Sequence, residues 1–267
     1  MPPPNDEYLR ESVVAAMDGD DAALFPYLPD IYRDLTEIGS SPETIVSLAR
    51  KHAARKGAGL RVLDPGCGKG AVSIQFAREL GCNCLGIDGV AEFIDEARKQ
   101  AAGSGLSGLC EFRHGDVYSA AAELDAAGEK FDIVVLGAVG PILGDYGETL
   151  SVCANRLVPG GIIVMEDGYI PDESDFKHPP LLKRNVLMGY AKQAGLELLE
   201  ERIDTVEEPR EAEAHEFAAV EQRCRELIAE HPEDARLFEN YIRKQKEEYE
   251  ILATKLTCAT MVFGLNE

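Results

Sequence analysis

The spacing of hydrophobic and polar residues changes near residue 60, and the change divides the chain in two. Upstream of it, apolar side chains recur at helical spacing, which predicts helices ahead of the core. These helices are expected over residues 5–17, 23–39 and 41–57. In the third stretch Ser41 is a possible amino-terminal cap, Pro42 occupies the first helical position, and Gly57 ends the helix. This pattern is typical of helix boundaries.

Downstream, short apolar runs alternate with amphipathic stretches. The runs predict strands over residues 60–66, 83–88, 110–116, 131–139, 161–167, 196–204 and 255–265. Amphipathic stretches predict helices between several of them, at residues 70–80, 90–102 and 147–157. Strands separated by helices pair in parallel with right-handed crossovers, so we expect an α/β, Rossmann-like doubly wound sheet. Ligands of such sheets lie beyond the carboxyl ends of the strands.

A charged stretch, residues 207–252, separates the last two predicted strands. Two apolar faces recur within it at helical spacing, which predicts a pair of amphipathic helices. The first face comprises Phe217, Val220, Cys224, Leu227 and Ile228, and the second Phe238, Tyr241, Ile242, Tyr249 and Leu252.

Composition and charge narrow the classes of function. The 267 residues are 45% hydrophobic and carry a formal net charge of −21, which weighs against nucleic acid and anionic membranes as partners. No apolar run approaches the roughly 20 residues that cross a bilayer. The opening residues lack the basic and apolar regions of a signal peptide, so we expect a cytoplasmic protein. The seven scattered cysteines are interpreted as reduced thiols, with no metal site.

The stretch Arg61–Leu80, RVLDPGCGKGAVSIQFAREL, carries the most specific chemistry. Its glycines let the backbone turn tightly and approach a ligand, and the same letters also satisfy the dinucleotide pattern. Asp64 indicates whether the loop binds a dinucleotide or a cationic cofactor. A carboxylate before the glycines repels a diphosphate and attracts an ammonium or sulfonium group. A cationic cofactor is therefore favoured.

This arrangement resembles the class I S-adenosylmethionine-dependent methyltransferases, whose first motif is an acidic residue before a glycine-rich loop. The similarity continues through GID, HGDV, FDIVVLGA and LVPGGIIVMED, over about residues 60–167. The resemblance implies a seven-stranded sheet whose last strand, near residues 257–265, runs antiparallel. It also implies S-adenosylmethionine as methyl donor, S-adenosylhomocysteine as product, and a small-molecule acceptor.

The resemblance assigns cofactor contacts residue by residue. Asp64 is expected near the methionine ammonium group, Asp88 at the ribose hydroxyls and Asp116 at the adenine amino group. The full set of expected cofactor-binding residues is Asp64, Gly66, Cys67, Gly68, Asp88, Gly89, Asp116, Val117 and Gly137. Pro65 departs from the aliphatic residue usual in the family and is expected to stiffen the loop. Lys69 lacks the spacing of a phosphate-binding loop and is interpreted as a solvated charge.

The sequence indicates neither the methyl acceptor nor a general base. A correctly positioned acceptor needs a general base only if it arrives protonated, so the reaction requires no particular catalytic side chain. No catalytic residue is assigned. Candidates for acceptor binding are aromatic residues ahead of the core and polar residues after the fourth and fifth strands: Tyr27, Tyr32, Asp145, Tyr146, Asp167 and Tyr169.

The chain is thus expected to have a helical lid (1–58), a methyltransferase core (59–206 and 253–267) and a helical insertion (207–252). The insertion is interpreted as a substrate cap or as the surface of a homodimer. The expected function is methyl transfer to a small molecule at an O, N, C or S atom. Two alternatives stay open: a nicotinamide-dependent oxidoreductase and a non-catalytic S-adenosylmethionine-binding module.

Overall fold

A computed structural model describes residues 6–55, 57–204 and 208–266. Seven strands form one sheet in the order β3-β2-β1-β4-β5-β7-β6. The strands are β1 (Arg61–Pro65), β2 (Asn83–Asp88), β3 (Cys110–His114), β4 (Phe131–Gly137), β5 (Leu157–Tyr169), β6 (Leu196–Ile203) and β7 (Thr257–Leu265). Strands β1 to β5 pair in parallel, and β7 runs antiparallel to β5 and β6.

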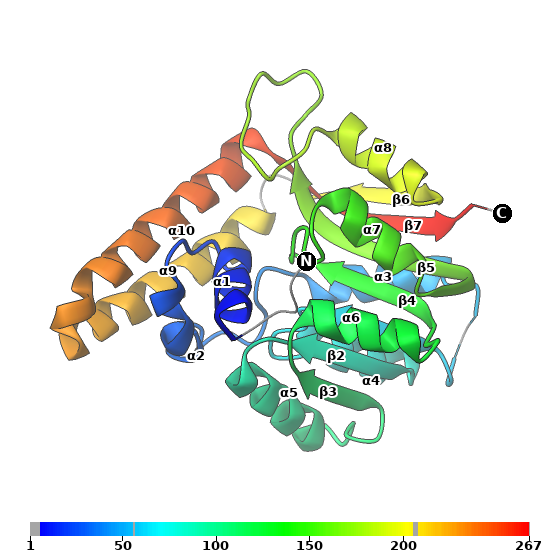
Figure 1. The fold of residues 1–267 in the computed structure, drawn as a ribbon, viewed down its shortest axis with the longest axis horizontal. Coiled ribbons are helices and arrows are strands. Elements are labelled where there is room, and N and C mark those ends of the chain that lie inside the picture. Colours follow the sequence, from blue (N-terminus) through cyan, green and yellow to red (C-terminus); the bar gives the residue numbers. More distant parts are fainter. Residues whose placement is uncertain (1–5, 56, 205–207, 267) are drawn as a thin grey trace.

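Helices cover both faces of this sheet (Figure 1). One face packs against α3 (Pro42–His52), α4 (Ala71–Leu80) and α5 (Ala91–Gly103). The other packs against α6 (Val117–Ala126), α7 (Tyr146–Ala154) and α8 (Arg184–Gln193). The inner strands β1, β2, β4, β5 and β7 are mostly apolar and buried, as a sheet covered on both faces requires, whereas the edge strands β3 and β6 carry charged, exposed residues.

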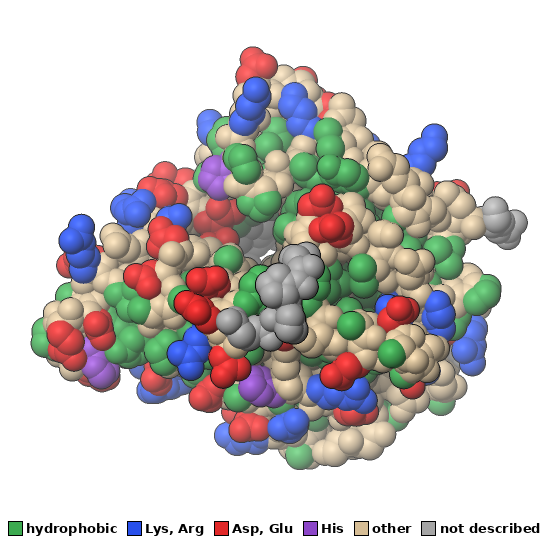
Figure 2. Space-filling model, viewed as in Figure 1, with side chains coloured by type: hydrophobic (Ala, Val, Ile, Leu, Met, Phe, Trp, Pro, Cys, Tyr) green, Lys and Arg blue, Asp and Glu red, His purple; other side chains and the backbone are tan. Residues whose placement is uncertain are grey.

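A third cluster of buried residues lies outside the sheet. It joins the amino-terminal elements to the inserted helices α9 (Glu208–Glu230) and α10 (Ala235–Lys255), which form a projecting arm (Figure 1). The amino-terminal elements are α1 (Asp6–Ala16), the 3-10 helix η1 (Ala22–Tyr27) and α2 (Leu28–Ile31); a second 3-10 helix, η2 (Pro232–Asp234), separates α9 from α10. Figure 2 shows a hollow between the arm and the core on this face.

The expected fold class is confirmed, including the antiparallel last strand, the amino-terminal helices and the helical insertion between the last two strands. The structure adds α8, and it adds α6, which the hydrophobic pattern did not predict because its run of alanines gives only a weak apolar face. It also ends α3 at His52, five residues before Gly57. None of the described helices combines the length and the apolar character needed to cross a membrane.

Candidate functional site

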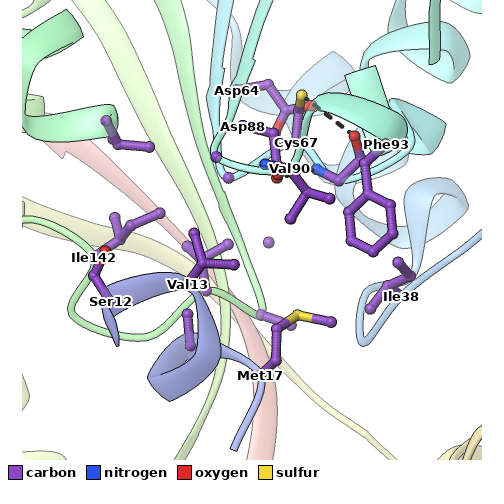
Figure 3. Close-up of a pocket in the computed structure, with 18 of the residues that line it drawn as sticks. Ser12, Val13, Met17, Ile38, Asp64, Cys67, Asp88, Val90, Phe93 and Ile142 are labelled. Atoms are coloured by element: carbon purple, nitrogen blue, oxygen red, sulfur yellow. Dashed lines mark hydrogen bonds between the residues drawn. The ribbon is translucent and has the colours of Figure 1, made fainter. Parts of the chain in front are cut away.

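A cavity of about 370 Å³ lies beyond the carboxyl ends of β1, β2 and β4. All nine residues expected to bind a cofactor line it. We call its two sides the floor and the roof (Figure 3). The floor comprises Asp64, Gly66, Cys67, Gly68, Asp88 and Gly137 at the strand ends, and the roof comprises Leu9, Val13, Met17, Thr36 and Ile38 from α1 and the segment after α2.

The glycine loop joins β1 to α4 and brings its backbone to the cavity wall. Gly66 has φ +77°, and a Cβ atom there would lie 2.7 Å from Val139 and 2.9 Å from Ile142. Gly70 has φ +78° and stands at the amino end of α4, where a Cβ atom would lie 2.6 Å from the Phe112 ring. Only glycine meets both the left-handed conformation and the lack of space.

The backbone amides of this loop point into the protein. Gly66 and Cys67 both donate to the carbonyl of Ile87, at 2.8 and 3.1 Å. Gly68 donates to Asp88 Oδ2 at 2.8 Å. A phosphate-binding loop presents its amides to the ligand. Because these three amides already have internal acceptors, the loop is not a seat for a diphosphate.

Asp64, at the end of β1, is a buried carboxylate with 3% of its surface exposed. It accepts a 2.7 Å hydrogen bond from the Ser73 hydroxyl in the first turn of α4. Burial raises the pKa of Asp64 to about 6, a shift that the Ser73 hydroxyl opposes and the nearby Asp88 reinforces. A cation bound beside this carboxylate would offset its loss of hydration.

Asp88, at the end of β2, holds the loop and faces the cavity. Its two oxygens accept from the amides of Gly68 (2.8 Å) and Val90 (2.9 Å). Burial raises its pKa, and both amides oppose that shift. The side chain is therefore fixed in place as a hydrogen-bond acceptor, as expected of a group that holds ribose hydroxyls.

Asp116 and Cys67 have structural partners as well as a place in the cavity wall. Asp116 Oδ2 accepts from the Ser119 amide at 2.6 Å and so caps α6. Burial raises the pKa of the Cys67 thiol well above its usual range, which makes it a poor nucleophile. Contact of either residue with a cofactor stays a prediction.

The interpretation of Lys69 as a solvated charge is wrong. Only 7% of the residue is exposed, and its ammonium group donates to the carbonyls of Tyr32 and Leu35, both at 2.7 Å. No motif in the sequence indicates this contact, because the carbonyls belong to a turn more than thirty residues upstream.

The six acceptor-binding candidates lie outside the lining of this cavity. Tyr27 donates to Asp234, Tyr32 pairs with Tyr241, and Tyr146 donates to Asp167, each at 2.8 Å. Asp145 forms the capping box of α7, and Tyr169 is buried in the sheet. The structure thus gives all six a structural place, and contact with an acceptor stays a prediction for them.

Sequence reasoning missed the residues that line the rest of the cavity. These residues include Tyr8, Ser12, Met17, Tyr118, Ile142 and Pro180. The charged residues of the lining are Asp64, Lys69, Asp88 and Asp116, all on the side of the strand ends and the glycine loop. Helical periodicity predicted the first helix but could not indicate that its apolar face covers a cavity.

The chain is similar to known methyltransferases. Residues 56–254 match the family model described as a methyltransferase domain. A segment of 106 residues is 40% identical to the ubiquinone biosynthesis O-methyltransferase of Cereibacter sphaeroides (strain ATCC 17025), and covers 40% of each protein. The match therefore spans less than half of that relative's length.

Solved structures show the same fold over nearly the whole chain. A methyltransferase from Thiobacillus denitrificans, crystallised with S-adenosylhomocysteine, has a TM-score of 0.72 at 22% identity, covering 90% of this chain and 98% of that one. The [4+2]-cyclase SpnF has a TM-score of 0.71 at 17% identity, covering 98% and 97%. The predicted resemblance is confirmed: with three quarters of its length matched by the family model, this chain belongs to the methyltransferase-domain family.

Proposed function

We propose that this protein is an enzyme that transfers a methyl group from S-adenosylmethionine to a small, uncharged, largely apolar acceptor. One observation carries the proposal: a single cavity joins an acidic, glycine-lined floor to an uncharged end beneath α1. The floor matches a cationic donor, and the uncharged end adjoins it.

The residues present fit the donor. Asp64 would lie near its ammonium group, Asp88 would accept from the ribose hydroxyls, and Gly66 and Gly68 would bring backbone close to it. When bound, S-adenosylmethionine supplies an activated methyl group. The protein then has to orient the acceptor and exclude water. The roof would exclude water, because Val13 of α1 packs directly against Gly89, just after β2, and so closes the cavity there.

The acceptor end favours a neutral molecule with an apolar ring. Pro180 presents apolar surface there, and Tyr8 and Tyr118 meet edge to face with ring centroids 6.4 Å apart. Such a wall suits an aromatic acceptor better than an isolated charged one. The name of the relative, a ubiquinone biosynthesis O-methyltransferase, supports an oxygen atom as the methylated position. Together with the aromatic wall, this favours a phenolic hydroxyl.

The two alternatives have less support. A nicotinamide dinucleotide needs a diphosphate seat, and the loop amides are already bonded to Ile87 and Asp88. A binding module without catalysis needs no acceptor space, whereas the cavity continues beyond the floor. The likeness to a [4+2]-cyclase means that the test must detect methyl transfer itself and not only donor binding.

The experiment is a transfer assay with S-adenosylmethionine labelled in its methyl group, against matched sets of phenols, alkyl amines and thiols. We expect labelled methyl ethers from phenols. Labelled products from amines alone would overturn the acceptor class. Donor binding without transfer to any acceptor would favour the binding module. The net charge and reduced thiols support the further proposals that the enzyme is cytoplasmic and does not bind nucleic acid.

A further inference from the structure

A buried chain of hydrogen bonds connects the glycine loop to the end of α1. It starts at Lys69, whose ammonium group donates to the carbonyls of Tyr32 and Leu35 after α2. The Tyr32 hydroxyl lies 2.8 Å from the Tyr241 hydroxyl on α10. The Tyr241 hydroxyl donates to the Met17 carbonyl at 2.7 Å. Since a hydroxyl has one proton, Tyr32 must be the donor to Tyr241.

The links from Lys69 and between the two tyrosines are buried, and the link to Met17 is partly buried. Tyr32, Lys69 and Tyr241 are 3%, 7% and 2% exposed. Burial is the main cause that raises the pKa of both phenols, so both remain protonated donors at neutral pH. A broken link would leave a polar group buried without its partner, which is more costly than the loss of an exposed hydrogen bond.

Both ends of the chain lie in the cavity wall. Lys69 and Met17 line the cavity, and Gln245 of α10 also donates to the Met17 carbonyl, at 3.0 Å. The insertion holds the rest of the roof too. Glu216 of α9 accepts from the Gly39 amide at 3.1 Å, and Arg223 of α9 pairs with Asp34 at 2.6 Å. These contacts bracket Thr36 and Ile38, the roof residues after α2.

The apolar faces of the two inserted helices pack against other parts of the same chain. Val220, Cys224 and Leu227 of α9 and Phe238 and Tyr241 of α10 are buried in one cluster. The same cluster contains roof-supporting residues of the amino-terminal elements, Val14, Leu28 and Tyr32 among them. The inserted helices therefore back the roof and do not stand apart from it.

We propose that the α9–α10 insertion holds the roof over the methyl-donor site through this chain, so that Tyr32 and Tyr241 are positioning residues for donor binding. The proposal rests on the proposed function. It assigns the insertion a role inside its own active site, which sequence analysis had left open between a substrate cap and a dimer surface.

The test compares Tyr241→Phe with Tyr249→Phe. Both remove one hydroxyl from α10, but the Tyr249 ring stacks on Phe217 and its hydroxyl has no hydrogen-bond partner within the described part of the chain. Titration calorimetry gives the Kd for S-adenosylhomocysteine, and hydrogen exchange reports the protection of amides in residues 6–17. Thermal unfolding of each variant measures any general loss of stability.

We expect Tyr241→Phe to raise the Kd about 3- to 10-fold, the effect of one lost buried hydrogen bond, and to speed exchange in α1. The KM for S-adenosylmethionine should rise similarly while kcat at saturating donor stays within about twofold. Tyr32→Phe should act alike, and combining it with Tyr241→Phe should add little, because both break one link. Tyr249→Phe should match the wild type.

Wild-type Kd and wild-type exchange in Tyr241→Phe would overturn the proposal, as would an equal effect in Tyr249→Phe. A wild type that binds no S-adenosylhomocysteine would instead overturn the proposed function. In that case, the rate of hydrogen exchange in α1 would decide whether the insertion holds the roof: faster exchange in Tyr241→Phe than in the wild type would support it, and equal exchange would overturn it.

Discussion

The floor and the roof of the cavity are built in different ways. The floor is held by contacts between near neighbours in sequence: Asp88 binds Gly68, twenty residues away, and Asp64 binds Ser73, nine residues away. The roof is held by partners 209 and 224 residues away, through Tyr32, Tyr241 and Met17. The floor is thus a local motif, whereas the roof exists only once the whole chain has folded.

This difference implies that the floor sets whether the donor binds at all, and that the roof adjusts how tightly it binds and which acceptor fits. Substitutions in the floor should therefore have the larger effects.

Replacing Asp88 with alanine should have the largest effect. The change removes the acceptor of two loop amides and the expected ribose contact, so the Kd for S-adenosylmethionine should rise at least about 100-fold. Calorimetry measures it. Asp95→Ala, which removes an exposed carboxylate from α5, is the control and should bind normally. Tight binding by Asp88→Ala would show that the floor does not hold the donor.

Substitutions of the two glycines at the ends of α4 distinguish the cost of steric crowding from the cost of backbone strain. Both Gly70 and Gly81 flank α4 with positive φ. A Cβ atom at Gly70 meets the Phe112 ring and Ala97, whereas one at Gly81 meets nothing within 4 Å. Gly70→Ala should lower the free energy of unfolding by about 2 to 4 kcal/mol and Gly81→Ala by about 1 kcal/mol. Equal losses in urea unfolding would contradict the crowding at Gly70.

The turn after α1 should make stability depend on pH. Asp18 lies beside α9 and α10 but is exposed to solvent. Partial loss of hydration, and then Glu248, raise its pKa to about 7; Glu216 adds to the rise, and Gln245 and Lys244 oppose it. Because solvent screens these interactions, the contribution to stability should be small. Because the folded state binds this proton more tightly than the unfolded state, its contribution to stability is lost as pH rises from about 4 to about 7.

Asp18→Asn tests this contribution, since asparagine tolerates the φ of +59° at this position. Urea midpoints at pH 5 and pH 7.5 should fall less between the two values in the variant than in the wild type. The same fall in both proteins would show that Asp18 titrates normally.

The smallest effect is expected at the acceptor end. Tyr118→Phe keeps the ring that meets Tyr8 and removes only a hydroxyl in the cavity wall. The KM for a phenolic acceptor should change by about threefold, while the Kd for S-adenosylhomocysteine should stay constant. A change in donor binding alone would place Tyr118 on the donor side instead.

The same contrast explains what the sequence could predict. Asp64, Asp88 and the glycines were found because their chemistry depends on a short strand, loop and helix whose letters are contiguous. The fold followed from alternating runs, apart from α8 and from α6, whose alanines give little periodic signal. All nine expected cofactor residues came together in one cavity.

The roof could not be predicted in this way. Lys69 was misread because its acceptors are carbonyls, which carry no side-chain signature. Tyr32 was noted as an aromatic residue near a substrate, but its partner Tyr241 lies in a segment with no motif. Charge pattern alone does not show which face of α10 meets the turn after α1. Such contacts depend on tertiary packing, which a linear pattern does not record.

The most direct test of the central claim is calorimetric titration of the wild-type protein with S-adenosylhomocysteine and with NAD under the same conditions. The buried carboxylate and inward-facing loop amides predict saturable binding of S-adenosylhomocysteine at one site and no detectable heat with NAD. Saturable binding of NAD without binding of S-adenosylhomocysteine would contradict the assignment of this cavity to a methyl donor.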